Sequence, residues 1–268
     1  MVSNGMTDLR TICFIGAGNV ATHLCVALHH VGYSINGIFS RHIENARQLA
    51  QKVDCAVAVD QLEQLPYADM YFFSVKDCVL EEMARAFSTL TRNPDALFVH
   101  TAGSMPLSLL SDAFKNAAVF YPMQTFSKNR QLDFKTISVF IEANSCENLS
   151  RVEKLASAIS DKVCELSSLK RKKLHLAAVF ACNFSNHCYN LAFNLLEKEG
   201  VDPTCLLGLI DETTRKIHEI SPHQAQTGPA VRWDQNVMNE QLEQLNENPT
   251  MQAVYKVMSE SIHEEFTR

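Results

Sequence analysis

Two glycines and an alanine at a fixed spacing, Gly16-x-Gly18-x-x-Ala21, stand between an apolar β-type segment and a helical pattern. In such a loop the first glycine permits a tight turn, the second lets the backbone approach a pyrophosphate, and the small third residue allows close helix–strand packing. The helix would offer free N–H groups and the positive end of its dipole to the phosphates. We expect a dinucleotide-binding loop made of Gly16, Ala17, Gly18, Asn19 and Val20. The alternative is a strand–turn–helix connection without a ligand.

The end of the second expected strand bears on the choice of nucleotide. NAD sites place an acidic residue there to hold the ribose 2′-hydroxyl, whereas this chain has Ser40-Arg41-His42. A hydroxyl and a guanidinium suit a 2′-phosphate, which an acid would repel. Ser40 and Arg41 therefore predict NADP as the cofactor, unless Arg41 is only a surface arginine after a strand. The missing acid also argues against an S-adenosylmethionine-dependent methyltransferase.

Two later strands end in small and polar residues that could line the nicotinamide half of such a site. The fourth expected strand ends at Ser74-Val75-Lys76-Asp77 and the fifth at His100-Thr101-Ala102-Gly103. In open α/β sheets the ligand lies across the carboxyl ends of the strands. We expect His100 to be a catalytic candidate there, against a plain capping or packing role, and Lys76 and Asp77 could simply be a solvated helix start. The cofactor residues expected at this edge are Ser74, Val75, Lys76, Thr101, Ala102 and Gly103.

The next candidates lie on a long apolar segment in the last third of the chain. His175, Cys182 and Asn186 share a face if this segment is an α-helix, and Asn183 and Asn190 lie beside that face. We predict a substrate wall in which His175 donates a proton to a carbonyl or imine and Asn183 assists. The alternative is a set of buried amides that tie helices together, within the chain or at a dimer interface.

Two further groups could contribute to binding. The turn-rich segment 227–234 carries Arg232 and Asp234, which could hold an anionic substrate group or form a structural ion pair. Tyr121 and Gln124, at the end of the sixth expected strand, could point into the cleft.

Short apolar strands alternate with helical patterns over the first 167 residues, which predicts an α/β, Rossmann-type, doubly wound and mostly parallel sheet. From Lys170 onward no strand pattern remains, and we expect domains at 1–167 (NADP binding) and 168–268 (all-helical, for substrate and dimerisation). The segment 175–200 is apolar nearly all round, which indicates a helix buried on most faces. The expected strands are Leu9–Ile15, Ser34–Phe39, Ala56–Val59, Met70–Val75, Ala96–His100, Ala117–Met123, Thr136–Ala143 and Lys162–Ser167. The expected helices include Val79–Leu90, Ser104–Phe114, Ser145–Ser160, 235–246 and 249–266.

Composition excludes several other classes of protein. The chain of 268 residues has a net charge of −6 and a pI near 5.9, which argues against nucleic acid as a partner. It has no apolar run long enough for a membrane span and no secretory signal, so we expect a cytoplasmic protein. Nine cysteines are scattered without Cys-x-x-Cys pairs, so we expect no metal site. Cys13, Cys25 and Cys164 are expected to be buried free thiols.

Six segments taken in order carry a family resemblance: FIGAGNVATHL, SVKD, HTAGS, YPMQTFS, HLAAVFACNF and TGPAVRWD. Together they resemble a family of bacterial Rossmann-like NADP oxidoreductases without a settled substrate. Its members join an N-terminal domain similar to pyrroline-5-carboxylate reductase to a C-terminal domain of unknown function. The resemblance implies a helical C-terminal domain like that of 6-phosphogluconate dehydrogenase and a homodimer formed through it. It also implies that Gly16, Gly18 and Ala21 form the cofactor loop and that Ser40-Arg41 contacts the 2′-phosphate.

The chain departs from related enzymes at two positions. β-Hydroxyacid dehydrogenases and ketopantoate reductases use a Lys-x-x-x-Asn pair on the first long helix, whereas Val179 stands four residues before Asn183 here. His175 is a candidate substitute for that lysine. Many relatives carry His-Pro where this chain has Tyr121-Pro122, so a histidine role cannot be transferred to that site.

These observations predict an oxidoreductase that transfers hydride between NADP(H) and a small-molecule carbonyl, imine or alcohol. The missing Lys-x-x-x-Asn pair keeps a second hypothesis open: a non-enzymatic NADP-binding sensor or partner subunit. A third hypothesis is hydride exchange between NADP and a deazaflavin.

Overall fold

The computed structural model describes residues 11–53, 57–90 and 93–267. The chain divides into two compact units, Met1–Cys182 and Asn183–Arg268. We call them the sheet unit and the helical unit and describe each by itself. The division falls later than the expected boundary after residue 167, because helix α6 (Ser168–Ala178) belongs with the sheet unit. Residues 9, 10 and 56, where two strands were expected to begin, lie outside the described residues.

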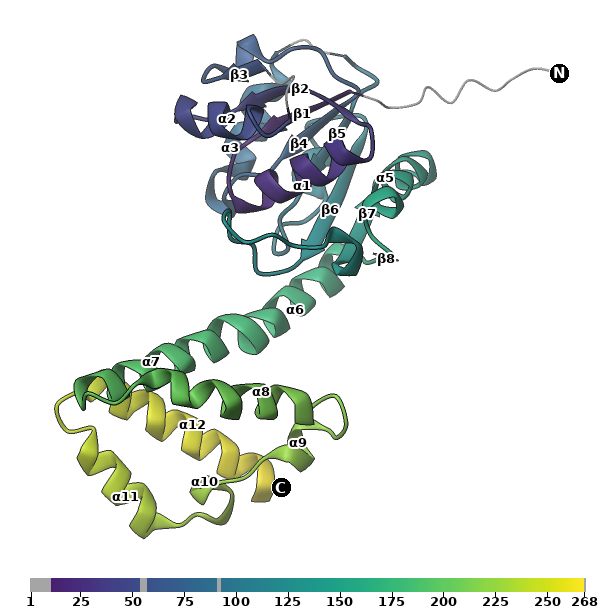
Figure 1. Cartoon of the computed structure of the whole chain (residues 1–268). Coiled ribbons are helices and arrows are strands. Elements are labelled where there is room, and N and C mark those ends of the chain that lie inside the picture. The colour runs from purple at the N-terminus through teal and green to yellow at the C-terminus, as the bar shows by residue number, and fades with distance from the viewer. Residues whose placement is uncertain (1–10, 54–56, 91–92, 268) are drawn as a thin grey trace. The chain divides into compact units, whose positions relative to one another are not determined.

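The sheet unit is built on an eight-stranded sheet in the order β3-β2-β1-β4-β5-β6-β7-β8 (Figure 1). The strands β1 to β6 run parallel, β7 is antiparallel to β6, and β8 is parallel to β7. The order reverses between β1 and β4, where an open α/β sheet forms its binding crevice. The expected doubly wound, mostly parallel sheet is thus confirmed. The strands are β1 (Thr11–Ile15), β2 (Ser34–Phe39), β3 (Val57–Val59), β4 (Met70–Phe73), β5 (Leu97–His100), β6 (Ala117–Met123), β7 (Ser138–Ala143) and β8 (Lys162–Glu165).

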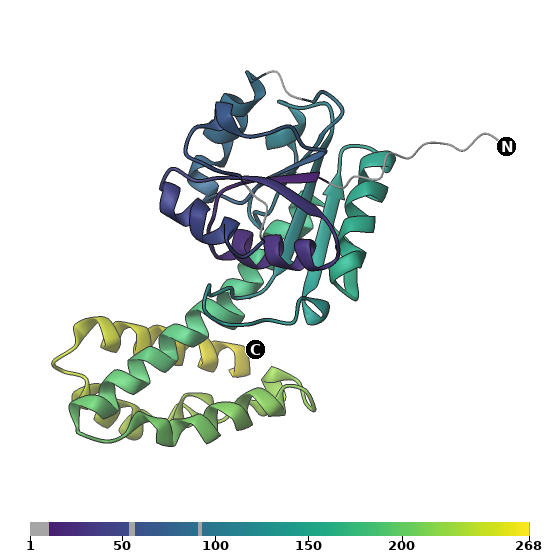
Figure 2. The same cartoon turned by 45° about the horizontal axis from the view of Figure 1, so that its top comes forward.

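Strand alternation divides the core into two layers, one on each face of the sheet. Phe14 and Phe72 face helices α1 (Asn19–His30), α2 (Ile43–Ala50) and α5 (Cys146–Ile159) (Figures 1 and 2). Ile15 and Phe73 face the opposite layer, with α3 (Asp77–Ser88) and the short α4 (Ser108–Ser111). Successive strand residues point to opposite faces, so a central strand covered on both sides must be apolar throughout.

Helix α6 is fixed to the sheet by a buried ion pair. The Arg171 side chain is completely buried and its guanidinium pairs with the Glu142 carboxylate at the end of β7. It also donates to the Met105 carbonyl oxygen at 2.6 Å. Ser168, one turn earlier, donates to Glu142 through its backbone N–H at 2.9 Å and its hydroxyl at 2.7 Å. Since a guanidinium cannot be left unpaired in a low-dielectric interior, these contacts fix where α6 begins.

The helical unit continues with α7 (Ser185–Lys198), which follows a π-helical segment (Val179–Phe184) that spans the division. No strand occurs among its described residues, as expected. Its single tryptophan, Trp233, has a left-handed backbone at φ 51° and stacks on His263 with ring centroids 4.3 Å apart. The remaining helices are α8 (Leu207–Lys216), α9 (Pro222–Ala225), α10 (Pro229–Arg232), α11 (Gln235–Gln244) and α12 (Pro249–Thr267).

Several sequence-based expectations need correction. The segment 175–200 was expected to be buried, yet much of it is exposed in this chain, including Leu176 and Phe180. The helix expected at Ser104–Phe114 is reduced to the one turn of α4. Cys164 lies exposed on the edge strand β8, whereas Cys13 and Cys25 are buried as expected.

No described helix is both long and apolar enough to cross a membrane.

The ion pair between Arg171 and Glu142 should make a large contribution to stability. We expect Glu142→Gln to lower the free energy of unfolding by about 3 kcal/mol, because it leaves a buried guanidinium without a countercharge. The matched control is Glu44→Gln, whose pair with Arg47 is 69% and 59% exposed and should contribute less than about 0.5 kcal/mol. Urea unfolding followed by circular dichroism measures both. Equal small losses would contradict the structural role of the buried pair.

Candidate nucleotide site and its neighbourhood

The turn after β1 has no room for a side chain at its first glycine. Gly16 has φ +115°, and a Cβ at this position would lie 2.3 Å from the Ser74 carbonyl oxygen. The Gly16 N–H donates to the Phe39 carbonyl at 2.8 Å. The loop is therefore held between the ends of β2 and β4, at the point where the strand order reverses.

The second glycine leaves the start of α1 open. Gly18 is exposed, and a Cβ on it would meet no atom within 4 Å. It caps α1 without any side-chain hydrogen bond, and the first turn contains no acidic residue. The first N–H groups of a helix lack partners within the helix, so here they are available to an anion. The cradle fits the pyrophosphate of a dinucleotide, with Ala17, Asn19 and Val20 beside it as expected.

The end of β2 offers a cation with no competing acid. Arg41 is exposed, and none of the carboxylates that the structure describes forms an ion pair with it. The nearby Glu44 pairs with Arg47 instead. The Ser40 hydroxyl accepts the His42 N–H at 3.3 Å. This donor set fits a phosphate monoester, which a free guanidinium can bind through two hydrogen bonds.

The loops after β4 and β5 are joined to each other. The Thr101 hydroxyl donates to the Ser74 hydroxyl at 3.2 Å, and both side chains are buried. Further out, the Ser104 hydroxyl donates to the Asp77 carboxylate at the start of α3. Lys76 is exposed and occupies the N-cap position of α3. The structure thus brings Ser74 and Thr101 together, and Asp77 and Ser104 join the two loops at a second point.

His100 occupies an interior position instead of the crevice wall. Its side chain is fully buried, and Nδ1 accepts the Ala102 N–H at 3.2 Å. Burial, together with the Arg171 cation, lowers the pKa of His100 to about 3, while the Pro106 carbonyl acts in the opposite direction. A neutral buried imidazole shapes the turn that presents Ala102 and Gly103. This favours the capping and packing role over the catalytic role expected for His100.

His175 and Tyr121 form a pair beside Gly103. The Tyr121 hydroxyl lies 3.0 Å from His175 Nδ1. A Cβ on Gly103 would come within 2.6 Å of that nitrogen and 2.8 Å of the Tyr121 ring. Burial raises the pKa of Tyr121, and Arg171 opposes this shift. The sequence indicated each residue separately but not their contact, which depends on strand β6 lying under helix α6.

The other candidates on and after the long helix do not join this cluster within one unit. The π-helical segment lies between His175 and Asn186, so the shared face expected for an unbroken α-helix no longer holds. Asn183, Asn186 and Asn190 are exposed and belong to the helical unit. There, the Asp234 carboxylate caps α11 by accepting the Val237 N–H. Among the ion pairs of the described residues, none joins it to Arg232. No cluster of three or more potential metal ligands occurs among the described residues.

The sequence analysis did not identify Glu142 and Arg171 as an ion pair, although the strand pattern contained a signal for one. In β7 the alternation places Val139 and Ile141 in the α1 layer of the core. Glu142 must then face the other layer, opposite Val119 of β6. A carboxylate on a core-facing position requires a cationic partner, and the basic run that begins at Lys170 could have supplied it.

The two glycines should respond differently to the same substitution. We expect Gly16→Ala to lower the free energy of unfolding by about 2 kcal/mol or more, because its φ is positive and its Cβ would overlap the Ser74 carbonyl. We expect Gly18→Ala to leave stability within about 0.5 kcal/mol while weakening NADPH binding, because its Cβ enters the open cradle. Thermal melting and calorimetric titration with NADPH separate the two effects. Unchanged NADPH affinity in Gly18→Ala would place the phosphates elsewhere.

Comparison with known proteins agrees with this geometry. Residues 11–101 match the family described as coenzyme F420-dependent NADP oxidoreductase, and residues 137–262 match a domain of unknown function, DUF2520. A search of curated proteins found no match.

Three solved structures illustrate the likeness. BF3122 from Bacteroides fragilis, a proposed NADP oxidoreductase, is 47% identical over 95% of this chain and 98% of its own, with a TM-score of 0.91. TM1727 from Thermotoga maritima is 24% identical over 96% of this chain and 98% of its own, with a TM-score of 0.68. A pyrroline-5-carboxylate reductase from Coxiella burnetii is 17% identical over 97% and 98%, with a TM-score of 0.57. The last two show a shared fold. The chain therefore belongs, with BF3122, to the family of NADP oxidoreductases that join an F420-dependent-type NADP oxidoreductase domain to DUF2520.

Proposed function

We propose that this protein is an NADPH-dependent reductase of a small-molecule carbonyl or imine, able to run in reverse on the corresponding alcohol or amine. The observation that carries the proposal is the contact of Tyr121 and His175 with Gly103. It supplies a proton-handling pair at the strand edge where the nicotinamide half of a bound dinucleotide lies in this fold. When bound, NADPH would supply the hydride, and the chain must supply orientation and a proton.

The hydrogen bond between Tyr121 and His175 favours one proton arrangement. The raised pKa of Tyr121 keeps the phenol protonated at neutral pH, so its hydroxyl can donate to Nδ1 of His175. A neutral imidazole that accepts at Nδ1 carries its proton on Nε2. His175 would then donate its Nε2 proton to the carbonyl oxygen or imine nitrogen while the Tyr121 hydroxyl passes its proton to Nδ1. The ring stays neutral, and solvent would reprotonate the phenolate left on Tyr121.

The test is NADPH consumption over a panel of aldehydes, ketones and cyclic imines. Reduced coenzyme F420 belongs in the panel, because the matched family is described as dependent on it. For an active substrate, His175→Gln should lower kcat by about 10²- to 10⁴-fold, the usual contribution of a general acid. Tyr121→Phe should lower it less and shift the pH profile. NADPH affinity should stay within about twofold in both variants.

Two results would count against the catalytic assignment. Full activity in His175→Gln would remove His175 from the reaction. NADPH binding without turnover of any substrate would favour the alternative of a non-enzymatic NADP-binding sensor or partner subunit.

The preference for NADP is proposed from Arg41 and Ser40. We expect Arg41→Ala to weaken NADPH binding by roughly 10- to 100-fold, the loss of one charge-assisted phosphate contact, and to leave NADH binding nearly unchanged. Arg47→Ala is the control, since that arginine already pairs with Glu44. Calorimetric titration of both nucleotides measures the difference. An equal loss for NADH and NADPH would show that Arg41 does not read the 2′-phosphate.

We also propose a homodimer, because exposed apolar side chains concentrate on the long helices. In the sheet unit, Leu176 and Phe180 are 58% and 63% exposed. In the helical unit, Phe184 and Leu209 are 50% and 65% exposed. Apolar surface of this kind marks an interface, and a second copy of the chain fits it by symmetry.

Light scattering should give twice the chain mass of 30.1 kDa. The variant Leu176→Glu with Phe180→Glu should shift the measured mass to that of the monomer. A monomeric wild type would contradict the proposal.

A further inference from the structure

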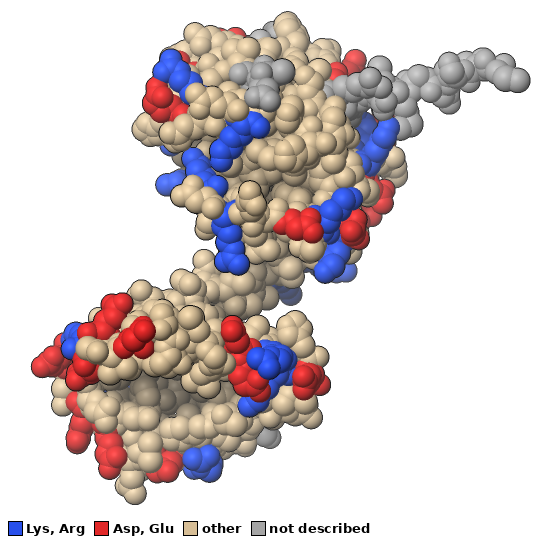
Figure 3. Space-filling model, in the orientation of Figure 1, with Lys and Arg blue, Asp and Glu red and all other residues tan. Residues whose placement is uncertain are grey.

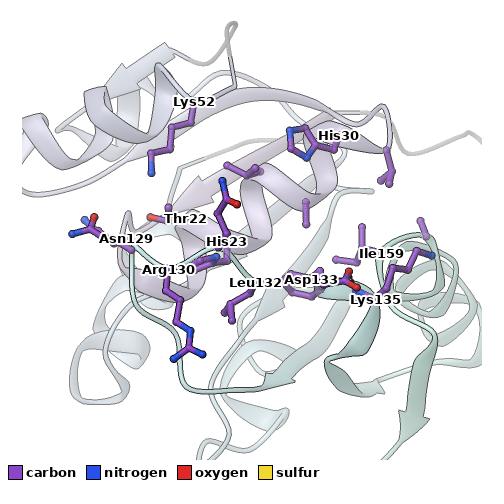
Figure 4. A pocket seen from close by; sticks show the side chains of 17 residues that line it. Thr22, His23, His30, Lys52, Asn129, Arg130, Leu132, Asp133, Lys135 and Ile159 are labelled. Carbon is purple, nitrogen blue, oxygen red and sulfur yellow. Dashed lines mark hydrogen bonds between the residues drawn. The ribbon is translucent and has the colours of Figure 1, made fainter. Parts of the chain in front are cut away.

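A groove of about 950 Å³ lies along the outer side of α1 in the sheet unit (Figure 4). Its floor is a stripe of the helix that runs from Thr22 to Val31, about 14 Å at 1.5 Å per residue. One wall carries Lys52, which follows α2, and the opposite side is formed by the loop residues 128–135 and by the end of α5 at Ala158 and Ile159. In Figure 4, Lys52 reaches toward α1 from one side and Arg130, Leu132 and Asp133 lie along the other.

The rim of this groove is strongly cationic. Lys52, Lys128, Arg130 and Lys135 line it, against the single carboxylate of Asp133. Asp133 Oδ1 is already engaged, because it accepts the Lys135 N–H at 3.0 Å. Lys135 also lies 3.3 Å from Asp161.

The other three cations are free of ion pairs within the described part of the chain: no described carboxylate pairs with Lys52, Lys128 or Arg130. The whole chain carries a net charge of −6, so this face departs from the average charge of the surface. Blue side chains are accordingly prominent on the sheet unit in Figure 3. Cations grouped around a concave surface attract an anion and can hold it by charge-assisted hydrogen bonds.

Apolar residues share the lining of the groove with polar ones. Val26 and Ala27 form the middle of the floor, and Leu132, Phe134 and Ala158 complete it from the loop and α5. A ligand site that combines an apolar interior with a few polar groups at its edge binds molecules with both characters. The groove thus fits an anion with an apolar or aromatic body better than a bare inorganic ion.

The groove is separate from the nucleotide loop. Its lining contains neither the glycines of that loop nor Ser40 or Arg41. The groove loop is fastened to α1 at two points: the Asn19 side chain donates to the Phe126 carbonyl at 2.9 Å, and His23 Nε2 lies 2.9 Å from the Ser127 carbonyl. These bonds hold the groove open at the flank of the helix whose N-terminus faces the cofactor.

We propose that this groove is a second ligand site, which binds a small organic anion: a phosphate or carboxylate group held by Lys52, Lys128 and Arg130, with an apolar body over Val26, Ala27 and Leu132. The site is independent of the reductase chemistry, so it can be tested whether or not a substrate is known.

The experiment is calorimetric titration of the full chain, saturated with NADPH, using 1-naphthyl phosphate and decanoate as probes. We expect at least one probe to bind with NADPH in place, and the pair to show whether the site prefers phosphate or carboxylate. Lys128→Gln with Arg130→Gln should weaken that binding by at least about tenfold, since each lost charge-assisted contact is substantial. The matched control is Arg85→Gln with Lys115→Gln, which removes two exposed cations of the same unit and should change it less than twofold.

Three outcomes would overturn the proposal. The first is that neither probe binds. The second is that the probe competes with NADPH, which places the probe in the cofactor crevice. The third is that the variant Lys128→Gln with Arg130→Gln binds the probe as well as the control variant does. Inorganic pyrophosphate that competes as well as the naphthyl compound would overturn the requirement for an apolar body. NADPH affinity and melting temperature, measured on each variant, distinguish loss of the site from loss of the fold.

Discussion

The sheet unit depends on one buried charge. Arg171 is the largest of its fully buried side chains, and it lies where water cannot compensate the guanidinium. Glu142, the Met105 carbonyl and Ser168 must therefore converge on it, and their convergence fixes the start of α6 against β7 and against the loop after β5. His175 follows four residues later on the same face of the helix. The position of the contact between His175 and Tyr121 thus depends on the ion pair between Arg171 and Glu142. Burial lowers the pKa of His100, and the same cation adds to this shift, so that neighbouring imidazole is neutral.

Helix α1, in the other layer of the core, contributes to three different parts of the sheet unit. Helix α1 begins at the glycine cradle and carries the cationic groove on its flank, while its buried face packs through Ala21, Leu24, Cys25 and Leu28. One rigid helix therefore serves three environments with three sets of side chains. The loop 124–136 is attached to the first turn of this helix through Asn19 and His23, so its shape and that of the phosphate cradle are set together.

Much of the fold could be predicted because its determinants are local. The apolar run Ser34–Phe39 matches β2 residue for residue, and the glycine spacing of the phosphate loop requires only a strand before it and a helix after it. The failures have a common physical origin in contacts that are distant along the chain. The apolar segment 175–200 indicates that its residues should be buried. It does not indicate whether they pack against other parts of this chain or against another chain. The hydrogen bond of Tyr121 with His175 spans 54 residues and arises only once β6 and α6 are stacked. The π-helical segment has no periodic signature in the sequence. The sequence therefore could not predict that this segment disrupts the face expected to be shared by His175 and Asn186.

The stacking of Trp233 on His263 has a practical consequence. The chain has one tryptophan, and it lies in the helical unit, held in a left-handed conformation at the end of α10. Its fluorescence emission is therefore a spectroscopic label for the helical unit alone. Events in the sheet unit leave the label unaffected unless they are transmitted across the division. A change in tryptophan emission on adding the oxidised nucleotide, which does not absorb where tryptophan emits, would therefore report communication between the two units.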